Sequence, residues 1–243
     1  MLAACFAALG LAVGLAALPT RAVGLAALPT HAVGSPLLCF PLDVGGAATL
    51  PFGGEGLDVK SDLSTEEVVK LTRALLEKSD DPLVHMETLR RATIWFMNKD
   101  AAEAAGKFRA VLADATLRAA AATGDGTARA HHEAMRWLDL GYFQAAARQG
   151  GVLQLKNAHE WLEKAARLAP DDLALRFGVA LAQFSPGEEG DPKAWARHLQ
   201  VVLDAKELSP LLKKNAVATF GTFLQVSDWE KLGAEVRKRL GRA

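Results

Sequence analysis

The chain has 243 residues, in which 28 Lys and Arg balance 28 Asp and Glu, and 50% of the residues are hydrophobic. A chain without net charge lacks the basic face expected of a nucleic-acid-binding protein. Two cysteines are too few for a disulfide-built scaffold, and the hydrophobic content excludes a mainly disordered chain. Many alanines and few β-branched runs favour helix, so we expect an all-α protein.

The N-terminal segment indicates export. Residues 2–18 carry no charge, and their length is that of a signal-peptide core rather than of a comfortable bilayer span. The following ten-residue repeat ends in Ala32-Val33-Gly34, which places small residues at the two positions that a signal peptidase reads. We therefore expect residues 1–34 to be a signal peptide removed before Ser35, and the protein to be periplasmic or secreted.

The two cysteines bear on this expectation. Cys5 ends a Leu-Ala-Ala-Cys sequence that resembles a lipobox, so a lipid anchor is the alternative to simple cleavage. Cys39 would be the only cysteine of the exported chain, which predicts no intrachain disulfide. Its side chain is then either packed as a small apolar residue, which is the commoner case, or available for an intermolecular bond.

Residues 35–63 form a compositional block of their own. Three prolines and five glycines between positions 36 and 57 exclude a regular helix, whereas the Phe and Leu residues there indicate packing. We expect an extended segment clamped across a helical domain that comprises residues 64–243.

Within that domain, helix-capping residues mark a succession of amphipathic helices. Ser64 and Glu67 form a capping box, after which Val68, Leu71 and Leu75 fall on one helix face. The other predicted starts are Asp81-Pro82, Asp100, Asp171, Asp191-Pro192, Ser209-Pro210 and the Ser227-x-x-Glu230 box. About nine helices are predicted, and Phe108, Val111, Leu112, Ala115 and Ala119 form the apolar stripe of the one after Asp100.

Three tryptophans recur at a fixed spacing. Trp161, Trp195 and Trp229 are 34 residues apart, which is the tetratricopeptide period. The segment NAHEWLEKAARLAPDD (157–172) resembles the second helix of a tetratricopeptide repeat, and the preceding helix contains a W-x-x-L-G sequence at 137–141. Residues 130–240 are thus similar to this family. The alternative is an irregular helical bundle with the tryptophans in its core.

The resemblance implies an α-solenoid of antiparallel helix pairs, in which the first helix of each pair lines the concave side. The helices at 172–184 and 210–225 would then face a partner, and Phe177, Leu181 and Phe184 would form an apolar strip. Basic residues flank that strip. The candidate partner-binding residues are Arg176, Phe177, Leu181, Lys213 and Lys214, which suit a peptide carrying a carboxylate. The other interpretation is that the strip is core between repeats, where we also expect Trp161.

Patterns for catalysis and metal binding are weak. His131 and His132 are adjacent and point about 100° apart on a helix, so they are poorly placed to bind one metal, and His159-Glu160 lacks the second His of HExxH. Glu87 and Arg91 have the spacing of a surface ion pair, so we expect this helix face to be solvated. The alternative is that Arg90 and Arg91 bind an anion or a carboxylate. We expect no metal site and no cofactor.

These observations predict an exported, non-catalytic helical-repeat scaffold of the cell envelope that binds a protein or peptide. The alternative is a cell-envelope enzyme whose site is assembled from dispersed residues, for instance around His85, Glu87 and Arg90. A purely structural module in a larger assembly is a third possibility.

Overall fold

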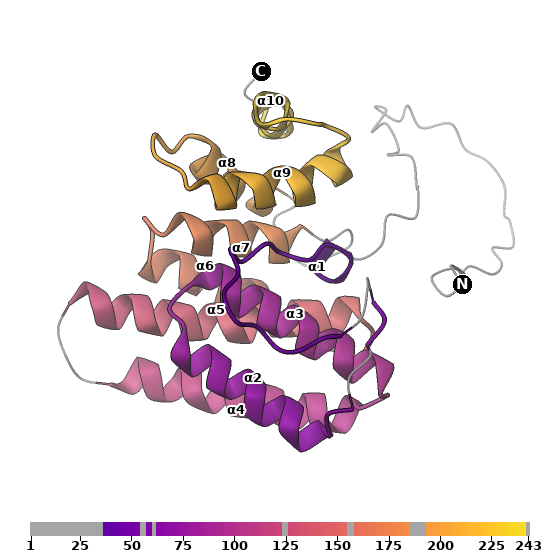
Figure 1. The fold of residues 1–243 in the computed structure, drawn as a ribbon. Coiled ribbons are helices and arrows are strands. Elements are labelled where there is room, and N and C mark those ends of the chain that lie inside the picture. Colours follow the sequence, from indigo (N-terminus) through magenta and orange to yellow (C-terminus); the bar gives the residue numbers. More distant parts are fainter. Residues whose placement is uncertain are drawn as a thin grey trace, which may run out of the picture. The chain divides into compact units, whose positions relative to one another are not determined.

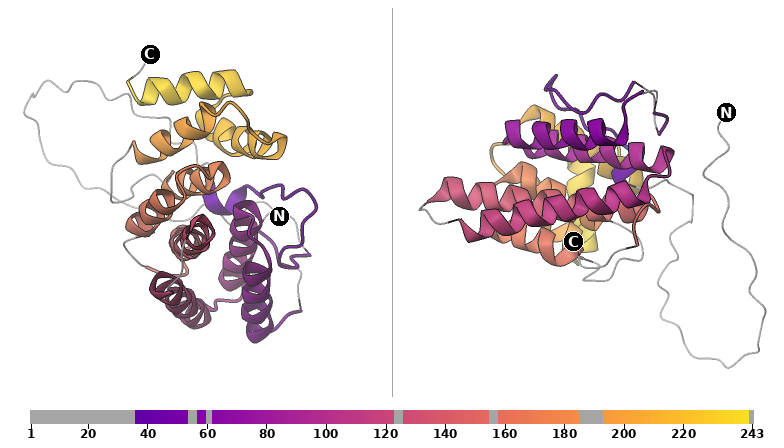
Figure 2. Two further views of the ribbon diagram at one scale, coloured as in Figure 1. Left: turned by 90° about the vertical axis from the view of Figure 1, so that its left-hand side faces the viewer. Right: turned by 90° about the horizontal axis from the view of Figure 1, so that it is seen from below.

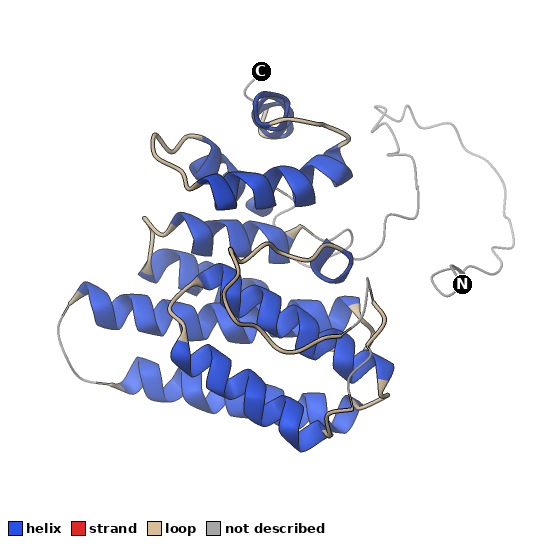
Figure 3. Cartoon of the chain, viewed as in Figure 1, coloured by secondary structure: helices blue, strands red, loops and turns tan. Residues whose placement is uncertain are grey.

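The computed structural model describes residues 36–53, 57–59, 62–122, 126–154, 158–184 and 193–241. Over these ranges the protein contains ten helices and no strand, which confirms the all-α prediction (Figure 3). None of the helices found there is both long and apolar enough to cross a bilayer. The predicted signal peptide and the Asp191-Pro192 helix start lie outside the described residues.

From α2 onward the helices follow one another along the chain, whereas a longer segment separates α1 from α2 (Figure 1). They are α1 (Pro36–Cys39), α2 (Thr65–Lys78), α3 (Pro82–Asn98), α4 (Ala102–Ala121), α5 (Thr127–Gln149), α6 (Ala158–Leu168), α7 (Leu173–Gln183), α8 (Ala194–Leu203), α9 (Pro210–Leu224) and α10 (Trp229–Arg239).

Several helix starts are confirmed. Ser64 and Glu67 form the capping box of α2, and Asp81 and Ser209 cap α3 and α9, each followed by Pro at the first helical position. Two starts are displaced by one residue. The side chain of Asp172 caps α7 and that of Asp228 caps α10, rather than Asp171 and Ser227.

Asp100 does not cap α4, contrary to the prediction. The φ angle of Asp100 is 48°, which lies in the left-handed region. The Asp100 N–H donates to Met97 O at 3.3 Å, and the Ala101 N–H donates to Phe96 O at 2.9 Å. This pair of hydrogen bonds is the Schellman arrangement that closes a helix. Asp100 therefore ends α3, and α4 begins without a side-chain cap.

The buried face of α2 also differs from the prediction. Val68, Thr72 and Leu76 are buried, whereas Leu71 is 36% exposed and Leu75 is half-buried. Val68, Thr72 and Leu76 are spaced by four residues, so the face that meets α3 is rotated from the stripe that hydropathy alone selects.

Alternate helices make up the two sides of the array. On one side, α3, α5, α7 and α9 pack on one another in chain order, while α2, α4, α6, α8 and α10 each pack against an odd-numbered neighbour. The helices are stacked from α2 and α4 at one end to α10 at the other (Figures 1 and 2).

Helices α5 and α6 approach each other closely at Gly141. A Cβ on Gly141 would lie 2.8 Å from Leu162 Cγ and 3.3 Å from the Ala158 carbonyl oxygen, so only glycine fits here without a shift. The close packing of α5 on α6 thus explains the glycine at position 141 and the leucine at position 162, two of the residues that carry the resemblance to tetratricopeptide repeats.

The three tryptophans occupy different environments. Trp195 is 9% exposed and stacks on Phe220 with ring centroids 5.9 Å apart. Trp161 and Trp229 are half-buried and pack against the margin of the core. Trp161, predicted to be a core residue, is therefore only partly buried. The equivalent spacing of the rings does not give them equivalent burial.

Candidate functional site

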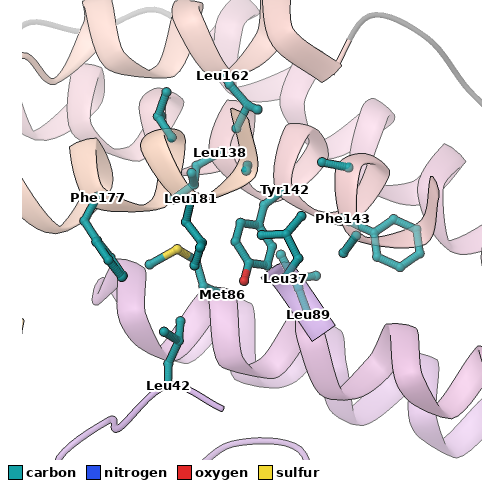
Figure 4. Close-up of a cluster of buried hydrophobic side chains, with 14 of the residues drawn as sticks. Leu37, Leu42, Met86, Leu89, Leu138, Tyr142, Phe143, Leu162, Phe177 and Leu181 are labelled. Carbon is teal, nitrogen blue, oxygen red and sulfur yellow. The ribbon is translucent and has the colours of Figure 1, made fainter. Parts of the chain in front are cut away.

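Residues 36–53, here called the strap, lie across the odd-numbered helices (Figure 1). The strap begins with the single turn α1, which contacts α3, α5 and α7, and Phe40 packs against Phe223 of α9 with ring centroids 5.0 Å apart. Leu37 and Leu42 enter the core (Figure 4). In the part of the expected extended segment that the structure describes, Pro36–Cys39 is helical, because Pro36 occupies a position where its missing N–H is not needed.

A buried ionic cluster on α3 holds the strap. The Glu87 carboxylate is 0% exposed and receives two hydrogen bonds from Arg90, at 2.7 and 3.0 Å, and one from Arg91 at 2.7 Å. The same carboxylate accepts from the Leu42 N–H at 3.0 Å. Arg90, which is 3% exposed, also donates to Leu38 O at 2.7 Å.

The prediction that this part of α3 is a solvated face is therefore wrong. Arg91 donates a further hydrogen bond to Leu50 O at 3.0 Å, and the guanidinium carbons of Arg90 and Arg91 lie 5.7 and 5.9 Å from the centre of the Phe52 ring. Glu87, Arg90 and Arg91 thus form hydrogen bonds with one another and with the main chain of the strap.

A second clamp lies on α9. Asn215 accepts from the Asp43 N–H and donates to the Asp43 carbonyl oxygen, both at 2.8 Å. Lys214 forms an ion pair with the Asp43 carboxylate at 2.6 Å, and the exposed Lys213 ammonium lies 5.4 Å from the centre of the Trp229 ring. Two of the predicted partner-binding residues therefore meet groups of their own chain.

The apolar strip predicted on α7 is core rather than surface. Phe177 is 0% and Leu181 is 1% exposed, and both point into the cluster that also contains Leu138 and Met86 (Figure 4). In this arrangement neither side chain is accessible to a partner. The reason is that α7 packs against α5, α8 and α1. Phe184, the third residue of the strip, is half-buried against Trp195 and Phe220.

Arg176 takes part in a polar network between α6, α7 and α8. It donates to His198 Nδ1 at 3.0 Å, so the proton of His198 lies on Nε2, which donates to Glu163 at 2.9 Å. Gln183 donates to Glu163 and to His159, each at 3.0 Å. The hydrogen bond from His198, with that from Gln183, lowers the pKa of Glu163 to about 2. His159 thus connects α6 to α7, and Glu163 connects α6 to both α7 and α8.

His85 is likewise committed to the structure. Its Nδ1 lies 2.6 Å from Asp139 and its Nε2 lies 2.7 Å from Ser79 O, so both nitrogens carry protons. Burial disfavours the charged ring, but the charge and hydrogen bond of Asp139 outweigh it and raise the pKa of His85 above 6.5. His85 and Glu87, the residues suggested for an enzyme, serve separate contacts and do not converge on a cavity.

Among the described residues, His131 and His132 do not belong to a group of side chains that could bind a metal. His131 Nδ1 lies 3.4 Å from an Asp172 oxygen, and His132 is exposed on the next position of α5. No set of three His, Cys, Asp or Glu side chains in the described ranges could hold a metal ion.

A groove between α2 and α4 was not predicted from the sequence. The two helices make little direct contact and enclose a volume of about 780 Å³. The apolar part of its lining consists of Val69, Ala74, Ala101, Ala104, Phe108 and Val111.

The predicted stripe on α4 contained a signal for this groove. Phe108, Leu112 and Ala119 are buried, whereas Val111 and Ala115 are half-buried and line the open space. A stripe wider than the contact that α5 covers leaves apolar side chains facing outward.

The groove continues into a smaller pocket of about 330 Å³ at the C-terminal ends of α2 and α4 and the start of α5. Arg73, Arg118, Arg129, Arg136 and His132 line it, and we call it the arginine pocket.

Comparison of the chain with models of known protein families, with curated proteins and with solved structures finds no significant match.

Proposed function

We propose that the protein is an exported, non-catalytic scaffold that binds another protein through the groove between α2 and α4. The observation that carries this proposal is the groove itself, in which an apolar floor lies between charged helix margins on a face that no described helix covers. Protein-binding grooves combine an apolar centre with a polar rim in this way.

The helix arrangement supports a solenoid of antiparallel pairs. Helices adjacent in the chain pack closely, as in the pairs α5–α6 and α7–α8, and α5 then packs on α7 of the next pair. Repeat arrays are built from such nearest-neighbour contacts, and their extended surfaces serve as binding sites. The 34-residue spacing of Trp161, Trp195 and Trp229, which lie on α6, α8 and α10, accords with this architecture.

The placement of the strap argues for the α2/α4 groove over the face first predicted. The strap lies across α3, α7 and α9, where a tetratricopeptide-like array would receive a peptide, and Glu87 and Asn215 hold its main chain there. That face is thus already occupied by the protein's own chain.

Site-specific photo-crosslinking in the native host tests the proposal. A photoreactive residue replaces Ala74, which is exposed and lines the groove, or Ala234, which is exposed on α10 and serves as the control. We expect a partner protein to crosslink at position 74 and not at position 234. This crosslink should be lost when Val69→Glu places a charge on the floor of the groove. The same set of adducts at both positions would contradict the proposal.

A further inference from the structure

The two ends of the α2/α4 groove carry opposite charge. At the N-terminal ends of the helices, the lining includes Glu66, Asp100 and Glu103, together with Lys70 and Lys107. At the other end, the arginine pocket contains four arginines and one acidic residue, Glu77. The charge therefore changes sign along the length of the groove.

The arginine pocket retains positive charge after its internal contacts. Arg73 pairs only loosely with Glu77, at 3.8 Å, and Arg118 pairs with Asp114. Arg129 donates to the Ala122 carbonyl oxygen and forms no ion pair with any described residue.

Arg136 adds to this excess. It lies 3.3 Å from Asp139, a carboxylate that also serves the buried His85 ring at 2.6 Å. One carboxylate therefore faces two cationic groups, so Arg136 is not fully neutralised. A carboxylate brought into the pocket would find donors already in place.

The apolar floor suits a helix better than an extended chain. The groove runs between two helices, whose main-chain groups are hydrogen-bonded internally, and its sides present alkyl and charged side chains. An extended peptide would find no sheet edge to pair with, whereas a helix satisfies its own main chain and needs only apolar anchors and matching rim charges.

We propose that the groove receives an amphipathic α-helix of a partner protein, with acidic side chains at the end that lies in the arginine pocket. This inference rests on the proposed function and specifies the chemistry of the partner. The chain's own apolar N-terminal segment does not meet this requirement, because residues 1–34 contain neither Asp nor Glu.

Two synthetic peptides test the inference against the full-length protein by fluorescence anisotropy. Each has about 18 residues, enough to span a helix of about 27 Å, with Leu spaced three and four residues apart. One carries Glu residues in its first turn, where they also stabilise the helix, and the other carries Gln there. We expect the Glu peptide to bind about tenfold more tightly at low salt, and this preference to fall below about threefold at about 0.5 M salt.

Matched variants locate the effect. Arg118→Glu with Arg129→Glu should remove the preference for the Glu peptide, whereas Lys206→Glu with Arg237→Glu changes the net charge equally at exposed positions outside the groove and should retain it. Ala104→Trp fills the floor and should weaken both peptides. Because Arg118 is exposed and Arg129 lies at the surface, the melting temperature of the double variant checks that the fold is intact.

The outcomes separate the two proposals. Equal binding of both peptides, abolished by Ala104→Trp, overturns the acidic specificity and leaves the groove as a protein-binding site. Binding that Ala104→Trp does not change places the peptides elsewhere and counts against both. Failure of both peptides to bind overturns the acid-ended helix, while the crosslink at position 74 still decides the proposed function. Peptide-independent self-association that Ala104→Trp abolishes would identify a second copy as the occupant and overturn the inference.

Discussion

Asn215 holds the main chain of Asp43 by two hydrogen bonds of 2.8 Å, although the two residues are 172 positions apart in the sequence. Its side-chain oxygen accepts from the Asp43 N–H, and its side-chain nitrogen donates to the Asp43 carbonyl oxygen. Because Asn215 itself is 2% exposed, this contact fixes the strap to α9 with little competition from water.

Asn215→Ala should release this part of the strap. Loss of both hydrogen bonds should lower the free energy of unfolding by about 1–3 kcal/mol, since a main-chain donor and acceptor lose their partner. Urea unfolding measures the change, and hydrogen exchange should increase at residues 42–44. The control, Lys214→Ala, removes only an exposed ion pair with Asp43 and should have a much smaller effect. Equal effects of the two variants would refute the clamp.

Glu87→Gln should be among the most destabilising conservative substitutions in α3. It keeps the shape of the side chain but removes the negative charge that Arg90 and Arg91 share in the core. An uncompensated buried cation costs about 3–5 kcal/mol, which urea unfolding would detect. Glu103→Gln removes an exposed ion pair with Lys107 and should have almost no effect. A small loss for Glu87→Gln would mean that water reaches the cluster.

His85 should make stability depend on pH near neutrality. Burial lowers the pKa of the His85 ring in the folded protein, but the charge and hydrogen bond of Asp139 outweigh burial and raise this pKa above 6.5. The raised folded pKa gives stability that is fully present below about pH 6.5 and is lost as the pH rises through the folded pKa.

Melting temperatures of the wild type and His85→Gln test this expectation. Their difference should be largest under mildly acidic conditions and should shrink as the pH rises. A difference that stays constant with pH would show that His85 is neutral in the fold. His131→Gln, at a half-exposed position, is the matched control.

The helix pair α5–α6 should be more sensitive at Leu162 than at Trp161. Leu162 is fully buried against Gly141, so Leu162→Ala should cost about 2–5 kcal/mol. Trp161 is half-buried, so Trp161→Ala should cost roughly half the 3–5 kcal/mol typical of a core aromatic. Gly141→Ala should destabilise the pair as well, because the added methyl group meets Leu162. A larger loss at Trp161 than at Leu162 by thermal unfolding would reverse this order.

The mature protein from its native host should begin at Ser35. The uncharged segment and the Ala-Val-Gly site precede this residue. Intact-mass analysis distinguishes the alternatives, since retention of Met1 would contradict cleavage, and a lipid adduct on Cys5 would indicate an anchor.

Features that depend on nearby residues were predictable. The caps at Ser64, Asp81 and Ser209 involve hydrogen bonds that reach two or three positions along the chain, so the sequence pattern contains both partners. The Pro- and Gly-rich composition of the strap likewise indicated an extended segment. Asp100 shows the limit of such patterns, because the same residue type can begin one helix or end the preceding one.

The environment of a charged helix face could not be predicted in this way. The spacing of Glu87 and Arg91 is identical for a solvated ion pair and for a buried cluster. Which of the two occurs depends on the strap. Leu42, 45 positions from Glu87 in the sequence, donates its N–H to the Glu87 carboxylate because the strap lies across α3. The burial of Phe177 likewise follows from the packing of neighbouring helices.

The sequence by itself determined the helical class and several helix starts, because these depend on hydrogen bonds and hydropathy within a few residues. Only the tertiary structure decided which faces are covered. The strap closes the surface of the odd-numbered helices, while α2 and α4 stand apart and leave Val69 and Val111 facing a groove. The physical reason is that the burial of an apolar or charged side chain depends on segments distant in sequence, whose approach is settled only when the whole array packs.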